Sequence, residues 1–351
     1  MKKLLLATAI AALSVSAANA APTVYGKAFV TADYVNAERD GDNDLYDVDS
    51  DSVQINSNIS RLGFKGSEAM TANTDVIYQL EYGIAIDGTD DNIGFKSRDT
   101  YLGLNNKDFG QFRFGRNYSV TDYINNVTVT EGYWDNLGVS NLDMDGDVLD
   151  AVTMADGGRV NDSIVWIAPK YNGLPLELAL QYGADESFVS DSDDRDSGYG
   201  ASLMFDQGTG FTAGVAYEKD MSQDGDLLRG SATVDLGKYM AAPVMLGAMY
   251  QVADFDGADN GTEDEKGLIV SAEMGLNNFA RPASVYVQYN GTKNLAGFDN
   301  RDSDQVVVGG KYNFKDNMIA HAYIGNNSAE DKNTNTDLDV FALGGGLEYL
   351  F

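Results

Sequence analysis

The feature that most restricts the fold of this chain is a two-residue alternation of apolar and polar side chains that recurs along its length. In residues 176–182, every second side chain is a leucine or a tyrosine, and the residues between them are Glu177, Ala179 and Gln181. Residues 244–252 repeat the pattern. Successive side chains of a β-strand point to opposite faces, so this period predicts strands with one apolar face. We therefore predict an all-β fold.

The first twenty residues have the pattern of a secretory signal peptide. Lys2 and Lys3 precede an apolar stretch that runs to about Val15, and Ala18-Asn19-Ala20 supplies small residues for cleavage after Ala20. The apolar stretch is shorter than the roughly 20 residues that a membrane helix needs. We expect residues 1–20 to be removed and residues 21–351 to form one exported domain without a membrane helix.

Segments with the two-residue period, counted together with the residues that break them, predict about sixteen strands. Their expected starts lie near Thr23, Ser52, Asp75, Lys96, Phe109, Asp162, Pro175, Ser197, Phe211, Leu227, Pro243, Gly267, Ala283, Asp304, Asp316 and Leu338. Short turns such as 105–108 and 314–317 alternate with long acidic connections. That alternation is typical of a transmembrane antiparallel β-barrel, whereas a soluble β-sandwich or propeller, the alternative, does not need it.

The charge and the rare residue types exclude several classes of function. With 54 acidic and 24 basic residues, the formal charge is -30, which argues against nucleic acid as a partner because phosphate binding needs clustered Lys and Arg. The chain has no cysteine and a single histidine, His321. A thiol enzyme and a multi-histidine metal site are therefore impossible, and a Ser-His-Asp site would depend on His321 alone. We expect a protein that is not an enzyme and has no cofactor.

Four segments resemble the general diffusion porins of the Gram-negative outer membrane. They are Val24-Tyr25-Gly26-Lys27, the stretch 60–66 with the sequence Ser-Arg-Leu-Gly-Phe-Lys-Gly, the stretch 101–118 and the closing Leu347-Glu348-Tyr349-Leu350-Phe351. They occur in the family's order and bracket the whole mature chain. The resemblance implies a sixteen-stranded barrel, a homotrimer, and a long third loop folded inward to narrow the pore.

The same resemblance assigns roles to four basic residues. Arg61, Arg98 and Lys27 match cations of the pore wall, and Arg116 matches another arginine of the family, which could instead serve the trimer interface. These cations are expected to form the basic half of the pore constriction and to face acids of the third loop, which sets a transverse field across the water column. Arg159 fits either the wall or the surface.

The third loop is expected between Tyr118 and Gly158, a stretch with eight acidic residues and no lysine or arginine. Glu131 and Asp135 lie at about the expected distance in sequence from Arg116, and they are our candidates for the acids that face the wall. The family's Pro-Glu-Phe-Gly-Gly core is replaced here by the sequence that begins at Glu131. An equal alternative is that the cluster from Asp143 to Asp150, which includes Asp145, lines the constriction or its vestibule.

Two further expectations concern partners. The last strand carries Tyr349 and Phe351 on its apolar face. In the family, such a terminal aromatic strand is recognised by the barrel assembly machinery. The acidic stretch 38–51 does not fit an EF-hand, because Leu45 occupies the position that requires glycine. We expect it to form a negative vestibule with loosely bound divalent cations that bridge to anionic lipopolysaccharide.

The sequence therefore predicts an outer-membrane porin in which small hydrophilic solutes and ions diffuse passively through a water-filled channel. The net charge and the acidic third loop predict a preference for cations, because a low-dielectric wall focuses the field of the acids along the pore. The alternative is a substrate-selective outer-membrane channel for a sugar or a small acidic nutrient.

Overall fold

A computed structural model describes residues 22–41, 48–88, 95–135, 154–170, 174–184, 197–221, 224–256 and 261–351. The expected signal peptide, residues 1–20, lies outside this part of the chain. The described residues contain no α-helix, and no helix among them is long and apolar enough to cross a membrane.

The elements follow one another almost entirely as strands. In chain order they are β1 (Thr23–Asp40), β2 (Val48–Ser57), β3 (Arg61–Ala69), β4 (Thr74–Gly83), β5 (Lys96–Asn106), β6 (Gly110–Tyr118), β7 (Arg159–Ile167), β8 (Leu176–Gly183), β9 (Gly198–Asp206), β10 (Phe211–Lys219), β11 (Gly225–Asp235), β12 (Val244–Phe255), β13 (Glu265–Gly275), β14 (Ala283–Lys293), β15 (Arg301–Lys315), β16 (Met318–Asp331) and β17 (Thr336–Leu350). Four 3-10 helices join them, η1 (Val120–Ile124), η2 (Gly132–Trp134), η3 (Leu236–Lys238) and η4 (Leu295–Gly297).

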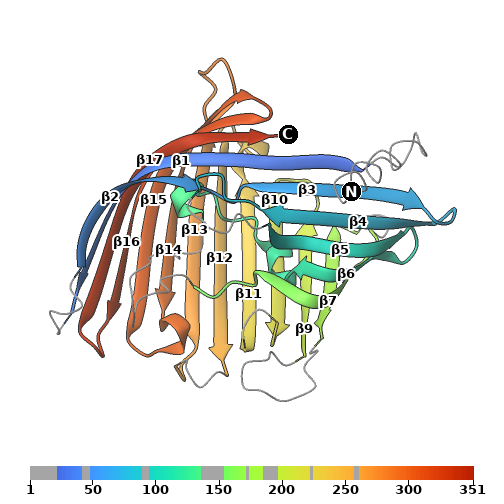
Figure 1. Ribbon diagram of the computed structural model, residues 1–351, viewed down its shortest axis with the longest axis horizontal. Helices are drawn as coiled ribbons and strands as arrows, with labels where there is room; N and C mark the ends of the chain where they lie inside the picture. The colour runs from blue at the N-terminus through green and yellow to red at the C-terminus, as the bar shows by residue number, and fades with distance from the viewer. Residues whose placement is uncertain are drawn as a thin grey trace, which may run out of the picture.

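These strands close into a single antiparallel barrel. Each strand from β3 to β17 pairs with its neighbour in the chain, and β1 closes the ring by pairing with β17 on one side and with β2 and β3 on the other. Because β2 and β3 lie end to end against β1, they occupy one strand position, and the barrel is sixteen-stranded, as predicted. In Figure 1, β4 to β6 in front run across β9 and β10 behind them, because every strand is tilted to the barrel axis.

The break between β2 and β3 has a local cause. Ile59 has a positive φ of 48°, a left-handed conformation that interrupts the regular extended backbone at this point. The Ser60 hydroxyl fills the gap in the ladder: it accepts a hydrogen bond from the Phe29 N–H at 3.0 Å and donates one to the Phe29 carbonyl at 3.2 Å. The predicted strand that starts near Ser52 is therefore one barrel strand interrupted between β2 and β3.

The predicted alternation of faces is confirmed along the strands. In β8, Leu180 and Tyr182 are 42% and 49% exposed, whereas Gln181 between them is 4% exposed. In β12, Tyr250 is exposed and Gln251 is buried. The exposed set is apolar and the covered set is polar, the opposite of a soluble β-sandwich. Such a barrel has an outer face suited to lipid and a polar interior.

The connections differ between the two ends of the barrel. At one end the chain turns within a few residues, as in 70–73, 107–109 and 316–317. The other end carries the longer connections, the longest being residues 119–158 between β6 and β7. Two connections at that end are nevertheless short, 220–224 and 332–335.

Candidate functional site

The inner wall of β1 to β7 carries a row of basic side chains. Lys27 on β1 lies directly opposite Arg61 on β3 in the ladder, so the two cations project from the same face. The Lys27 ammonium lies 5.2 Å from the centroid of the Phe29 ring. The structure thus brings together two of the four basic residues that the sequence singled out.

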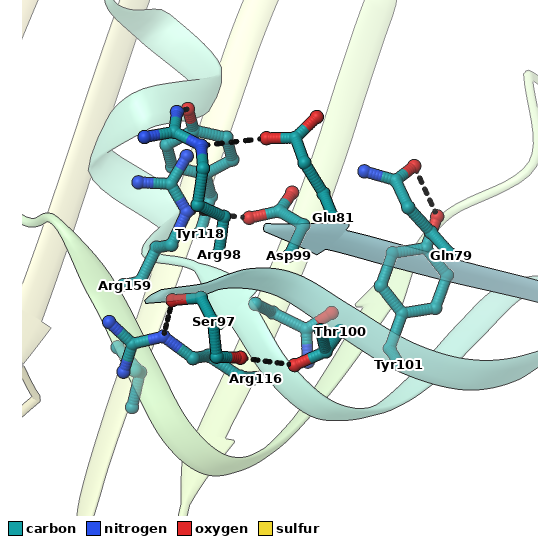
Figure 2. Close-up of polar contacts among 12 residues, drawn as sticks. Gln79, Glu81, Ser97, Arg98, Asp99, Thr100, Tyr101, Arg116, Tyr118 and Arg159 are labelled. Carbon is teal, nitrogen blue, oxygen red and sulfur yellow. Dashed lines mark hydrogen bonds and ion pairs between the residues drawn. The ribbon is translucent and has the colours of Figure 1, made fainter. Parts of the chain in front are cut away.

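A β-bulge brings Arg98 to the same wall. Leu80 pairs with Thr100 but Tyr82 pairs with Ser97, so Glu81 of β4 stands opposite two residues of β5, Arg98 and Asp99. A bulge of this kind turns two successive side chains toward one side of the sheet. The Arg98 Nε lies 2.8 Å from the Glu81 Oε1 (Figure 2).

Glu81 is the centre of this cluster. Its Oε2 accepts a hydrogen bond from the Tyr25 hydroxyl at 3.0 Å and lies 3.6 Å from the Nε of Arg61. Two wall arginines therefore share one wall carboxylate. Glu81 was not among the predicted site residues, although the alternation in 78–82 places it with Gln79 on the face opposite Tyr78, Leu80 and Tyr82. That parity was the available signal.

Arg159, which the sequence left open, belongs to the same wall. Its Nε lies 2.9 Å from the Asp99 Oδ1, and its guanidinium stacks 3.8 Å from the centroid of the Tyr118 ring. The Tyr118 hydroxyl accepts a hydrogen bond from Nη2 of Arg98 at 3.3 Å. Figure 2 shows both guanidinium groups close to Tyr118, each directed at its own carboxylate, Arg98 at Glu81 and Arg159 at Asp99.

Arg116 lies apart from this row. Its Nε donates to the Ser97 carbonyl at 3.2 Å, and its Nη1 donates to the Asn161 side chain. In Figure 2 it lies with Ser97 and Thr100, on the side of β5 away from Glu81. The structure does not bring Arg116 together with Arg61 and Arg98.

The first part of the long connection, residues 119–135, follows the opposite inner wall. Its backbone is held by side chains of that wall, one strand after another. Gln181 of β8 accepts from the Val120 N–H at 3.0 Å, Ser271 of β13 donates to the Val127 carbonyl at 2.5 Å, and Gln288 of β14 accepts from the Val129 N–H at 2.7 Å. Buried wall side chains thus bind this segment from β8 to β14.

The far end of this segment is fastened at β16 and β17. The Tyr323 hydroxyl accepts from the Tyr133 N–H at 3.1 Å and donates to Asp33 of β1 at 2.6 Å. Trp134 is fully buried, and its Nε1 donates to the Ala342 carbonyl at 3.3 Å. A Cβ on Gly325 would lie 2.7 Å from the Trp134 Cε2, so the ring occupies space that only glycine leaves open.

The candidate loop acids have partners other than Arg61 and Arg98. Glu131 forms an ion pair with Lys311 of β15, with 3.2 Å between Nζ and Oε1. Burial raises the pKa of Asp135 to about 6 and nearby Glu131 adds to the rise, while Lys27 and Lys311 oppose it. Lys311 is a further functional candidate that was not among the predicted site residues. Asp143 and Asp145 lie outside the described residues.

The returning part of the connection, residues 154–158, is tied to β11 and β13. Glu265 accepts from the Ala155 N–H at 2.7 Å, and Arg229, which is fully buried, lies 3.1 Å from the Asp156 Oδ1. Neither Glu265 nor Arg229 was a sequence candidate, since nothing in a strand pattern says which polar wall residue a distant loop will contact.

The terminal aromatic residues lie on the outer face. Tyr349 and Phe351 are 42% and 51% exposed, and their ring centroids are 6.1 Å apart. Phe351 also closes the barrel: its N–H donates to the Gly26 carbonyl at 3.1 Å and its carbonyl accepts from the Gly26 N–H at 2.9 Å. A Cβ on Gly26 would lie 2.3 Å from the Phe351 Cζ, so this ring covers a glycine.

Comparison with known proteins gives a consistent result. The family model for the Gram-negative porin matches residues 7–332. The chain is 28% identical to outer membrane porin N of Escherichia coli K12 over 92% of this chain and 91% of that protein, and 27% identical to major outer membrane protein P.IB of Neisseria gonorrhoeae over 90% of each.

Solved structures share the fold at low sequence identity. An anion-selective porin from Comamonas acidovorans superposes with a TM-score of 0.69 at 16% identity, over 95% of this chain and 100% of that one. OmpT of Vibrio cholerae, in its trimer form, superposes with a TM-score of 0.59 at 14% identity over 95% and 100%. At these identities the likeness concerns the fold alone.

Proposed function

The chain belongs to the Gram-negative porin family, and from that membership we propose that its barrel is a water-filled channel through which small hydrophilic solutes diffuse passively, with a preference for cations. It is an outer-membrane porin, and proteins of this family are channels rather than enzymes. The preference for cations and the nature of the solutes are our proposal.

The pairing of the wall arginines carries the proposed cation preference. Arg61 and Arg98 share Glu81, and Arg159 is paired with Asp99, so these guanidinium groups meet carboxylates on the wall itself. Paired charges present a weaker barrier to a passing cation than a bare row of arginines does, because the field of each pair falls off faster than that of a single charge. The formal charge of -30 can then attract cations into the channel, because the paired arginines do little to repel them.

The anion-selective porin with the same fold supports the view that interior side chains, and not the shape of the barrel, determine which ions a channel prefers. That protein is 16% identical to this chain. A barrel of one shape can hold either sign of field, because the interior residues alone face the water column. The charge pairs described above are therefore the part of this chain on which the proposal rests.

Planar-bilayer recordings with the purified protein test the proposal. In a salt gradient, we expect a reversal potential of the sign that cation passage produces, decreasing as the salt concentration is raised because ions screen the acidic groups. We also propose a homotrimer, as in the trimer form of OmpT, and it should close in three equal steps at high voltage. Anion preference would contradict the selectivity, and single-step closure would contradict the trimer.

We further propose that the barrel assembly machinery recognises the terminal strand, and that divalent cations loosely bound at the acidic stretch 38–51 bridge it to anionic lipopolysaccharide. Removal of Phe351 should sharply reduce the amount of folded barrel in the outer membrane, because it removes both backbone hydrogen bonds to Gly26 and the ring that covers it. Heat-modifiable electrophoretic mobility of outer-membrane fractions measures this amount. Phe351→Tyr keeps the ring and should assemble normally, whereas full assembly of the truncated chain would reject the proposed signal.

A further inference from the structure

An open cavity lies where the end of β6 meets the start of the long connection. Its volume is about 310 Å³, and it is lined by Arg113, Tyr118, Asp122, Tyr123 and Asn125. Sites for small organic molecules begin at about 300 Å³. The lining combines one cation, one carboxyl group, two aromatic rings and an amide. These groups could bind a ligand that carries charges of both signs and an aromatic ring.

The cation of this cavity is held in a fixed position. Arg113 donates from Nε to the Gln111 Oε1 at 2.6 Å and from Nη1 to the Tyr123 hydroxyl at 3.3 Å. Its guanidinium lies 4.8 Å from the centroid of the Tyr101 ring. Nη2 has no hydrogen-bond partner in the described part of the chain. A guanidinium held in this way can bind a carboxylate without losing further side-chain freedom.

Asp122, the carboxyl group of the cavity, is not held by hydrogen bonds as Arg113 is. Among the described residues, no side chain or backbone group donates a hydrogen bond to the Asp122 carboxyl. Burial, reinforced by nearby Asp156, raises its pKa to about 8. Arg229 and Arg159 oppose this rise, but Arg229 is engaged by Asp156 and Gln251, and Arg159 by Asp99. An ammonium group that entered the cavity would favour the ionised form of Asp122 and lower its pKa, so that the bound ligand and the carboxylate form an ion pair.

We propose that this cavity is a binding subsite on the permeation path for small zwitterions of the amino-acid or dipeptide class. The ligand's carboxylate binds Arg113, its ammonium group binds Asp122, and an aromatic side chain packs against Tyr118 and Tyr123. The inference rests on the proposed open channel and names one solute class for it. Opposite charges in one small cavity select a molecule that carries both, because an ion of either sign alone leaves one of the two groups unpaired.

Block of ion current in planar bilayers provides the test. The probes are L-phenylalanine, N-acetyl-L-phenylalanine, which lacks the ammonium group, and L-phenylalaninamide, which lacks the carboxylate. L-phenylalanine should block the current in a saturable way, and each of the other two should bind about tenfold more weakly or worse, because each loses one charge-assisted contact. Equal effects of the three compounds, or the absence of block in an otherwise conducting channel, would overturn the inference.

Two variants separate the contacts. Asp122→Asn should weaken block by L-phenylalanine and L-phenylalaninamide and leave block by N-acetyl-L-phenylalanine nearly unchanged. Arg113→Gln should weaken block by L-phenylalanine and N-acetyl-L-phenylalanine and leave block by L-phenylalaninamide nearly unchanged. The controls Asp316→Asn and Arg281→Gln make the same chemical changes at exposed turn positions. A channel that conducts without discriminating the compounds refutes the subsite only, whereas a protein that forms no channel refutes the proposed function itself.

Discussion

Replacing Trp134 with alanine is expected to give a wider and noisier channel. The ring is fully buried in an apolar cluster on the inner wall with Val340 and Ala342, against the bare backbone of Gly325. Loss of a buried tryptophan costs about 3–5 kcal/mol. Because the lost contacts join residues 119–135 to β16 and β17, most of this cost falls on the attachment of that segment and little on the barrel.

Single-channel recordings and solute exclusion in liposome swelling measure the effect. A segment that detaches reversibly should add current fluctuations and admit larger sugars. Trp134→Phe keeps most of the apolar contact and should behave nearly as the parent, and Trp166→Ala removes the other tryptophan, on β7, as a control for the substitution itself. Unchanged conductance and exclusion limit in a well-folded Trp134→Ala barrel would show that the segment does not depend on this anchor.

The second large effect is expected from Glu81→Gln, which removes the carboxylate that Arg61, Arg98 and Tyr25 share. The two guanidinium groups then present unbalanced positive charge to the pore. We expect a several-fold decrease in the ratio of cation to anion permeability, read from reversal potentials in a salt gradient. The change should be largest at low salt, because screening weakens the effect of the bare charges.

Two variants complete this experiment. Asp99→Asn should shift the reversal potential in the same direction, since it releases Arg159. Glu177→Gln removes a carboxylate of the same type from the end of β8, where it pairs with exposed Lys170, and should leave selectivity nearly unchanged. If Glu81→Gln and Glu177→Gln behave alike, the paired wall charges do not set the selectivity.

The resemblance led us to expect cations of the wall facing acids of the loop. In the described part of the chain, Arg61, Arg98 and Arg159 are paired with Glu81 and Asp99 of the wall, and Glu131 is paired with Lys311. Lys27 is a predicted wall cation that acts on a predicted loop acid, since its charge lowers the pKa of Asp135 against the effect of burial. The charges of the wall and the loop are therefore divided into local pairs.

The sequence alone determined the all-β barrel, the number of its strands, their approximate starts and the apolar face of each strand. This was possible because side-chain alternation and turn residues are local properties that depend only on neighbours in the chain. The aromatic terminal strand was also readable, since Phe351 continues the alternation of Leu347 and Tyr349.

Only the tertiary structure decided which interior residues meet. The bulge at β4 and β5, which turns both Arg98 and Asp99 toward Glu81, inserts one residue that strict alternation cannot show. The contact between Trp134 and Gly325 joins positions far apart in the chain. Alternation specifies the face on which a side chain lies. Its partner across the lumen depends on strand register and on the path of a long connection, and both are set by packing over the whole barrel.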